Sequence, residues 1–346
     1  MRLVTSSAAL LGVATLMALP AAIAAERVQV VTSFSLLADM VENVGGDHVA
    51  VTSLVGADGD THVYSPTPRD AQAVAEADLV VFNGLQFEGW MERLIDASDH
   101  DGLLVTATEG VERLSRGEAH DDHDDEHDGH EDEHQPHDEE HAPHDDHGHG
   151  NDDPHAWQDL AMGKVYVANI RDGLIEADPD NSEAYTVNAE RYINEIDSTH
   201  AEIGEQLSEI PPDTSVITGH DSFGYFAKAY GLRFLSPVGL STEGDASAAD
   251  MARLIDVIRD ENVRALFHEN MTSPAMIEQL AEETGLPIAG TLYADALASE
   301  GEASTWLGMM RQNADVLHEA LADPGHSPAD DRAHGDENQG DDNHDH

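Results

Sequence analysis

The segment NSEAYTVNAERYINEIDSTHAEIGEQLSEI, residues Asn181–Ile210, separates two halves of the chain that share one pattern of secondary structure. Apolar residues recur through this segment at mostly helical spacing, and Gly204 alone interrupts the pattern. Pro179 suits the beginning of a helix, and Pro211-Pro212 ends it. Periodicity leaves two interpretations open: one long helix that joins two lobes, or an ordinary helix packed within one lobe.

Both halves alternate between short strand-like runs and helix-like runs, which is typical of parallel sheets with helices on both faces. In the first half we expect strands at Val28–Thr32, Val49–Leu54, Leu79–Asn83 and Leu103–Thr106, and helices at Phe34–Val44, Pro68–Glu76 and Glu88–Ala97. In the second half we expect strands at Ser215–Thr218, Ala265–His268 and Pro287–Ala289, and helices at Ser222–Tyr230, Ala246–Glu261 and Ser304–Leu321. The sequence therefore predicts an α/β protein with two Rossmann-like lobes.

The first residues have the features of a cleavable signal peptide. Ala8–Leu19 is almost continuously apolar, Pro20 breaks the run, and Ala22-Ile23-Ala24 offers the small residues that signal peptidase requires. A membrane anchor is the alternative, but the run is short for a hydrocarbon layer of about 30 Å. The chain contains no cysteine. We therefore expect a periplasmic protein without a lipid anchor or disulfides.

The chain is strongly acidic, with 16 Lys and Arg against 70 Asp and Glu. This charge repels phosphate, which excludes a general nucleic-acid binder. Part of the charge lies in residues 117–150 and 323–346, but the remainder of the chain is acidic as well. Attraction of metal ions does not require such an excess. A high-salt habitat would screen the self-repulsion, and we offer this as a hypothesis.

Gly117–Gly150 has a composition unlike that of the rest of the chain, with ten histidines, fifteen acidic residues and no Lys or Arg. It holds almost nothing apolar, so we expect a disordered loop. Solubility explains the acids but not the histidines, whereas neutral imidazoles on a flexible chain bind borderline metals. We therefore favour collective low-affinity metal binding over an inert linker, by His120, His123, His127, His130, His134, His137, His141, His144, His147 and His149.

Three other histidines stand in distinctive surroundings. His62 lies in GDTHVYSPTPRD after the second predicted strand, and His155 lies in NDDPHAW where the polar loop ends. His220 lies in TGHDSFGYFAKAYGL, directly after the first strand of the second half. Such strand ends and loop junctions are where open α/β sheets form ligand sites. One histidine so placed is most often a loop or core residue, but three together favour a shared site.

Several motifs taken together resemble the zinc- and manganese-binding solute-binding proteins of ABC importers, called cluster A-I. They are G-D-x-H-x-Y-x-P-x-P-x-D, D-P-H-x-W, T-G-H-D-x-F-x-Y-F, E-N-M-T-S-P and Y-A-D-A-L, beside the acidic His-rich insertion. The resemblance covers nearly the whole mature chain and implies two α/β lobes bridged by one long helix. It divides the chain into a signal peptide (1–25), an N-terminal lobe (26–178), a linking helix (179–211), a C-terminal lobe (212–322) and an acidic tail (323–346).

The resemblance also implies four metal ligands, His62 and His155 from the first lobe and His220 and Asp295 from the second. Three imidazoles and one carboxylate make a closed four-coordinate site, which Zn²⁺ accepts at about 2.0–2.2 Å. Two ligands from each lobe would let the metal clamp the lobes together. Without the resemblance, the sequence around Asp295 favours nothing beyond a helix cap.

The implied function is that a monomer captures Zn²⁺, without catalysing a reaction, and delivers it to an ABC-type permease in the inner membrane. Manganese-selective relatives often have Glu where this chain has His220, and imidazole favours zinc, but manganese, iron and nickel stay open. A secreted zinc hydrolase is disfavoured because the chain has no H-E-x-x-H and four protein ligands leave little room for water. A periplasmic zinc sink without a transporter is the remaining alternative.

Overall fold

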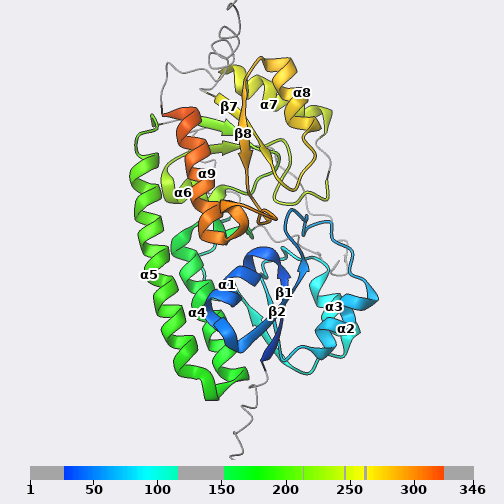
Figure 1. The fold of residues 1–346 in the computed structure, drawn as a ribbon. Coiled ribbons are helices and arrows are strands. Elements are labelled where there is room, and N and C mark those ends of the chain that lie inside the picture. The colour runs from blue at the N-terminus through cyan, green and yellow to red at the C-terminus, as the bar shows by residue number, and fades with distance from the viewer. Residues whose placement is uncertain (1–26, 116–151, 213, 245–246, 261–262, 323–346) are drawn as a thin grey trace, which may run out of the picture.

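The computed structural model describes residues 27–115, 152–212, 214–244, 247–260 and 263–322. The predicted signal peptide, the His-rich loop with its ten histidines and the acidic tail lie outside the described residues. Within the described ranges, no helix is long and apolar enough to cross a membrane. Figure 1 shows two α/β lobes, one drawn in blue and cyan and the other in yellow and orange, with a long green helix beside both.

The N-terminal lobe contains a four-stranded parallel sheet in the order β2-β1-β3-β4. Its strands are β1 (Val28–Phe34), β2 (Val49–Val55), β3 (Leu79–Phe82) and β4 (Leu103–Thr106), and its helices include α1 (Ser35–Gly45), α2 (Pro68–Glu76) and α3 (Met91–Ser98). The two central strands are buried along almost their whole length, which explains why the sequence of β3 is continuously apolar and why β1 does not alternate between apolar and polar residues.

The C-terminal lobe repeats the same strand order, β6-β5-β7-β8, again with parallel neighbours. Its strands are β5 (Ser215–Ile217), β6 (Arg233–Leu235), β7 (Val263–Glu269) and β8 (Ile288–Leu292), and its helices include α6 (Gly224–Tyr230), α7 (Ala248–Asp260) and α8 (Ala275–Thr284). In each sheet the strand order reverses beside the first strand, at β1/β3 and at β5/β7. The carboxyl ends of strands at such a reversal form a crevice suited to ligands.

Three longer helices complete the molecule: α4 (Leu160–Ala177), α5 (Ser182–Leu207) and α9 (Trp306–Leu321). Helix α5 is the long green helix of Figure 1. It contacts α1 and α4 beside the N-terminal lobe and α6 and α9 beside the C-terminal lobe. One continuous apolar core therefore extends through both lobes, and a smaller one lies behind β5 and β7 beneath α7 and α8. Of the two interpretations of this segment, the long helix beside both lobes is the one observed.

Two α-helices and one strand are absent from the sequence prediction: α4, α8 and β6. In α4, Gly163 and Gly173 weaken the helical pattern. Both glycines are packing positions, because the indole of Trp306 lies against Gly163 and the side chain of Val105 against Gly173. The glycines thus lower the helix propensity of α4 but let its neighbours pack closely against it. A pattern in one sequence does not reveal this close packing.

The start of α9 is fastened to the N-terminal lobe through Asp39 of α1. The backbone N–H of Trp306 donates to Asp39 Oδ2 at 2.9 Å, and the hydroxyl of Tyr192 in α5 donates to the same oxygen at 3.3 Å. Burial raises the pKa of Asp39 to about 6, an effect larger than the opposing one of these hydrogen bonds. One carboxyl group therefore connects three helices, and it holds its proton to a higher pH than a free aspartate does.

This preference makes a stability prediction. An Asp whose pKa is raised on folding stabilises the protein below its unfolded pKa, and that contribution is lost as pH rises through about 6. Asp39→Asn, which cannot ionise, should therefore gain about 1.4 kcal/mol of unfolding free energy relative to wild type between about pH 5 and about pH 7.5, roughly half of the about 3 kcal/mol that the whole titration carries. Urea unfolding of both proteins at the two pH values measures this gain. An equal difference at both would show that Asp39 does not titrate in this range.

Candidate metal centre

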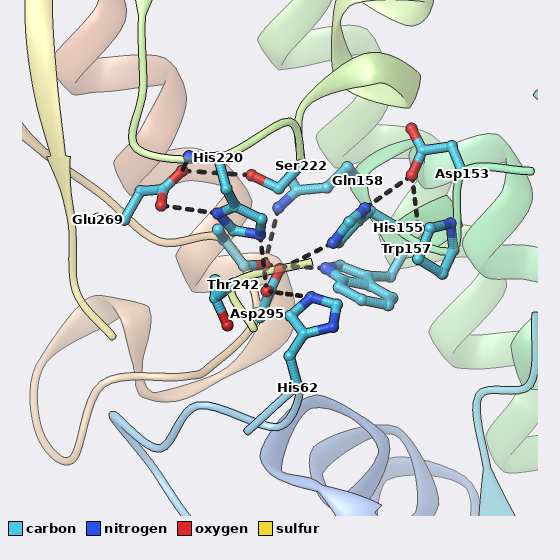
Figure 2. Close-up of polar contacts among 12 residues, drawn as sticks. His62, Asp153, His155, Trp157, Gln158, His220, Ser222, Thr242, Glu269 and Asp295 are labelled. Atoms are coloured by element: carbon cyan, nitrogen blue, oxygen red, sulfur yellow. Dashed lines mark hydrogen bonds and ion pairs between the residues drawn. The ribbon is translucent and has the colours of Figure 1, made fainter. Parts of the chain in front are cut away.

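The structure brings together the four residues expected to form the main site. His62 follows β2, His155 precedes the short 3-10 turn Ala156–Gln158, His220 follows β5, and Asp295 follows β8. One ligand atom from each lies within 4.8 Å of the others, and all four side chains are buried. Figure 2 shows the three imidazoles pointing toward the carboxylate of Asp295 from different directions. Two of the residues come from each lobe, so the cluster lies between the lobes.

The distances from Asp295 to the three imidazoles are close to those between ligands of a tetrahedral zinc ion. From the carboxylate of Asp295, Nε2 of His220 lies at 3.0 Å, Nε2 of His62 at 3.3 Å and Nε2 of His155 at 3.6 Å. Ligands bound at about 2.0–2.1 Å in a tetrahedron are separated by about 3.4 Å. Within the described part of the chain, Nε2 of His62, Nε2 of His155 and Oδ1 of Asp295 are buried without a hydrogen-bond partner. Unpartnered polar atoms that converge in this way are the donor set a metal ion satisfies.

Two carboxylates outside the cluster orient two of the imidazoles. Nδ1 of His155 lies 2.7 Å from Asp153, and Nδ1 of His220 lies 2.8 Å from Glu269. When Nδ1–H donates to a carboxylate, the lone pair of Nε2 is directed at the centre and becomes a stronger donor. Asp153 also accepts from the backbone N–H of His155 at 2.9 Å, which holds backbone and ring together.

The electrostatics of the site favour a cation. Burial would lower the pKa of His220, but Glu269 and Asp295 together raise it well above its usual range. Burial would likewise raise the pKa of Asp295, and His220 and His155 hold it well below its usual range. The centre therefore keeps a buried carboxylate and draws positive charge, and a metal ion would take the Nε2 position that a proton otherwise occupies.

Buried side chains fix the backbone just before three of the four residues. The indole N–H of Trp90 donates to the carbonyl of Thr61, before His62, at 2.8 Å. The amide of Asn83 donates to the carbonyl of Pro154, before His155, at 2.9 Å. The carbonyl of Ala294, before Asp295, likewise accepts from side chains. Such support holds a site in one geometry.

Some site residues were not identified from the sequence. Asp153 and Glu269 had no assigned role, although both lie in the recognised motifs. Glu269 is 49 residues from His220 and reaches it because β5 pairs with β7. Phe87 was also missed, and its ring meets the ring of His62 edge-on at 4.7 Å. His268, which precedes Glu269 in β7, is partly exposed and is not in the cluster.

Comparison with known proteins gives a consistent family. Residues 30–320 match the family model described as zinc-uptake complex component A, periplasmic. The manganese-binding lipoprotein MntA of Halalkalibacterium halodurans is 31% identical over 300 residues, covering 86% of this chain and 89% of that protein. The iron-binding protein YfeA of Yersinia pestis is 30% identical over 298 residues, covering 85% of this chain and 86% of that protein.

Solved structures show the same architecture. The periplasmic zinc-binding protein TroA from Treponema pallidum superposes with a TM-score of 0.74 at 27% identity, over 86% of this chain and 100% of that one. The similar proteins are thus named for three different metals, zinc, manganese and iron. Their similarity establishes family and fold, whereas the choice of metal depends on the donor atoms of this chain.

Proposed function

Because the chain belongs to the family of periplasmic zinc-uptake complex component A proteins, metal-binding components of ABC importers, we propose that its cargo is Zn²⁺. The ion is captured by His62, His155, His220 and Asp295 and delivered to a membrane permease. The observation that carries this proposal is the donor set: three imidazole nitrogens that lie 3.0, 3.3 and 3.6 Å from one carboxylate. Zinc accepts such a closed four-coordinate site readily.

Manganese is the second candidate, and the names of similar proteins favour it. Mn²⁺ prefers oxygen donors and higher coordination numbers, whereas three of the four donors here are nitrogens. Asp295 could supply both of its oxygens, since Oδ2 faces His62 and His220 while Oδ1 faces His155. A second oxygen from Asp295, as a fifth donor atom, would reduce the difference in affinity between Zn²⁺ and Mn²⁺ but would not reverse it.

We further propose that the His-rich loop, residues 117–150, collects metal weakly and passes it to the centre. The described chain stops at Ser115 and resumes at Asp152, and these two residues are themselves bridged. Both ends of the loop are therefore anchored side by side, and Asp152 lies three residues before His155. A tether this short corresponds to effective concentrations around the millimolar range, so weak loop sites suffice.

Calorimetric titration of the chelator-stripped protein with Zn²⁺ and with Mn²⁺, beside a variant lacking residues 117–150, tests this proposal. We expect one tight zinc site in both proteins, weaker sites in the full chain alone, and poorer manganese binding. Tight binding that disappears with the loop would instead indicate a zinc sink. Equal or tighter manganese binding would favour the manganese receptor.

The carboxylate partner of His220 gives a further prediction. Glu269→Gln keeps the size of the side chain but removes the charge that orients and strengthens the imidazole. We expect zinc affinity to fall about 10- to 100-fold, the usual cost of losing such a partner. Competition with a fluorescent chelator measures it. Glu278→Gln in the first turn of α8 changes the net charge equally and should leave affinity unchanged.

A further inference from the structure

We propose that Trp157 and Gln158 are positioning residues, which place Asp295 in the metal centre by holding the carbonyl oxygen of Ala294. This inference rests on the proposed function, because it assigns a role toward one of the four metal-binding residues. Neither residue belongs to the ligand cluster, and both lie beside it in Figure 2.

The contact geometry is specific. The indole Nε1–H of Trp157 donates to the carbonyl of Ala294 at 2.9 Å, and the amide Nε2–H of Gln158 donates to the same oxygen at 2.8 Å. A carbonyl oxygen has two lone pairs, so these donors saturate it. Trp157, Gln158 and Ala294 are all fully buried. Two buried donors on one acceptor, directly before Asp295, leave its backbone little freedom.

The donors come from the other lobe. Trp90 and Asn83 support ligands of their own lobe, whereas Trp157 and Gln158 reach from the N-terminal lobe to a ligand carried by the C-terminal lobe. They lie two and three residues after His155 in a tight turn, in which the N–H of Gln158 donates to the carbonyl of His155 at 3.0 Å. One short segment thus supplies a ligand and holds a second.

Burying the side chain of Gln158 costs folding free energy that its contact with Ala294 offsets. Its Oε1 is buried and, among the residues that the structure describes, has no hydrogen-bond partner. A buried amide with one unpaired end makes the folded protein less stable than an apolar side chain of similar size would. Its Nε2 is therefore the part of the side chain with an evident purpose, and that purpose is the carbonyl before Asp295.

The far side of Asp295 is held by the same lobe. The backbone N–H of Leu297 donates to the hydroxyl of Ser35 at 3.0 Å, and its carbonyl accepts from the N–H of Asp58 at 2.9 Å. Asp295 is thus bracketed by N-terminal-lobe contacts at Ala294 and at Leu297. Parting of the lobes would have to break them, so they connect metal retention to closure.

The test uses the full chain loaded with one equivalent of Zn²⁺ and follows release to excess chelator by stopped flow. Gln158→Leu and Trp157→Phe each remove one donor, and we expect each to speed release about tenfold, with a larger effect in the double variant. The visible absorption of the Co²⁺-loaded variants should change as well, because the carboxylate no longer sits at its tetrahedral position. The association rate should change little.

Tyr185→Phe is the matched control. It also removes one hydrogen bond of a buried side chain, to Asp178, far from the centre. The melting temperature of each metal-free variant separates positioning from general destabilisation. Release within about twofold of wild type, or release that tracks the metal-free melting temperature and is matched in the control, would overturn the inference. Wild-type protein without a tight site would instead refute the proposed function itself.

Discussion

Replacing Asp295 by Ala is expected to lower zinc affinity by roughly a thousandfold, the largest effect on binding that any single substitution here should produce. Structural zinc sites draw on the order of 10–16 kcal/mol from four ligands, so one ligand accounts for about a quarter. Asp295 contributes more than geometry, because it is the anionic member of the cluster and faces all three imidazoles. Without it the ion would enter a buried site with no carboxylate ligand.

Chelator competition on the full chain measures this loss. Asp315→Ala, on the exposed face of α9, removes the same charge from the surface and should bind zinc as the wild type does. Zinc affinity that stays near the wild-type value in Asp295→Ala, with the metal-free protein folded, would show that the carboxylate is not a ligand.

Replacing Gly163 by Ala is expected to cost the largest amount of stability. A Cβ at this position would lie well inside van der Waals contact with the ring of Trp306, which is fully buried. The ring cannot move freely, because its Nε1–H donates to the carbonyl of Trp157 at 3.1 Å. Overpacking of this kind costs about 1–3 kcal/mol and occasionally more, so we expect a melting temperature lower by roughly 2–6 °C.

Gly204→Ala is the control for this prediction, since it makes the same substitution within a helix. Around Gly204 no atom lies within 4 Å of an added Cβ, so alanine should stabilise α5 by up to about 1 kcal/mol. Opposite signs in thermal melting of the two variants are the expected outcome. A similar small gain in both would mean that the packing of α4 against Trp306 is loose.

The alternation of apolar runs was enough to predict two α/β lobes, because a buried parallel strand has a continuous apolar signature. Pro68–Glu76 and Leu103–Thr106 were predicted with the observed ends, since Pro68 marks a helix start and both runs are sharply bounded. Helix α4 was missed because its two glycines serve the packing of Trp306 and Val105, which depends on residues distant in the chain.

The candidate centre shows a similar division. His62, His155 and His220 stand in local surroundings that single them out, and the structure places them together. Asp295 was reached through family resemblance, because one aspartate after a strand carries no local signal. Glu269 and the donors on Ala294 depend on contacts between lobes and strands. A sequence pattern therefore indicates which side chains carry the chemistry better than which ones hold them in place.

X-ray absorption at the zinc edge, on the variant lacking residues 117–150 loaded with one equivalent of Zn²⁺, tests the metal centre most directly. The predicted first shell contains three imidazole nitrogens and one carboxylate group at about 2.0–2.2 Å. The same measurement on His155→Ala should show one imidazole fewer. A shell made mainly of oxygen, or a spectrum unchanged by that substitution, would contradict binding by His62, His155, His220 and Asp295.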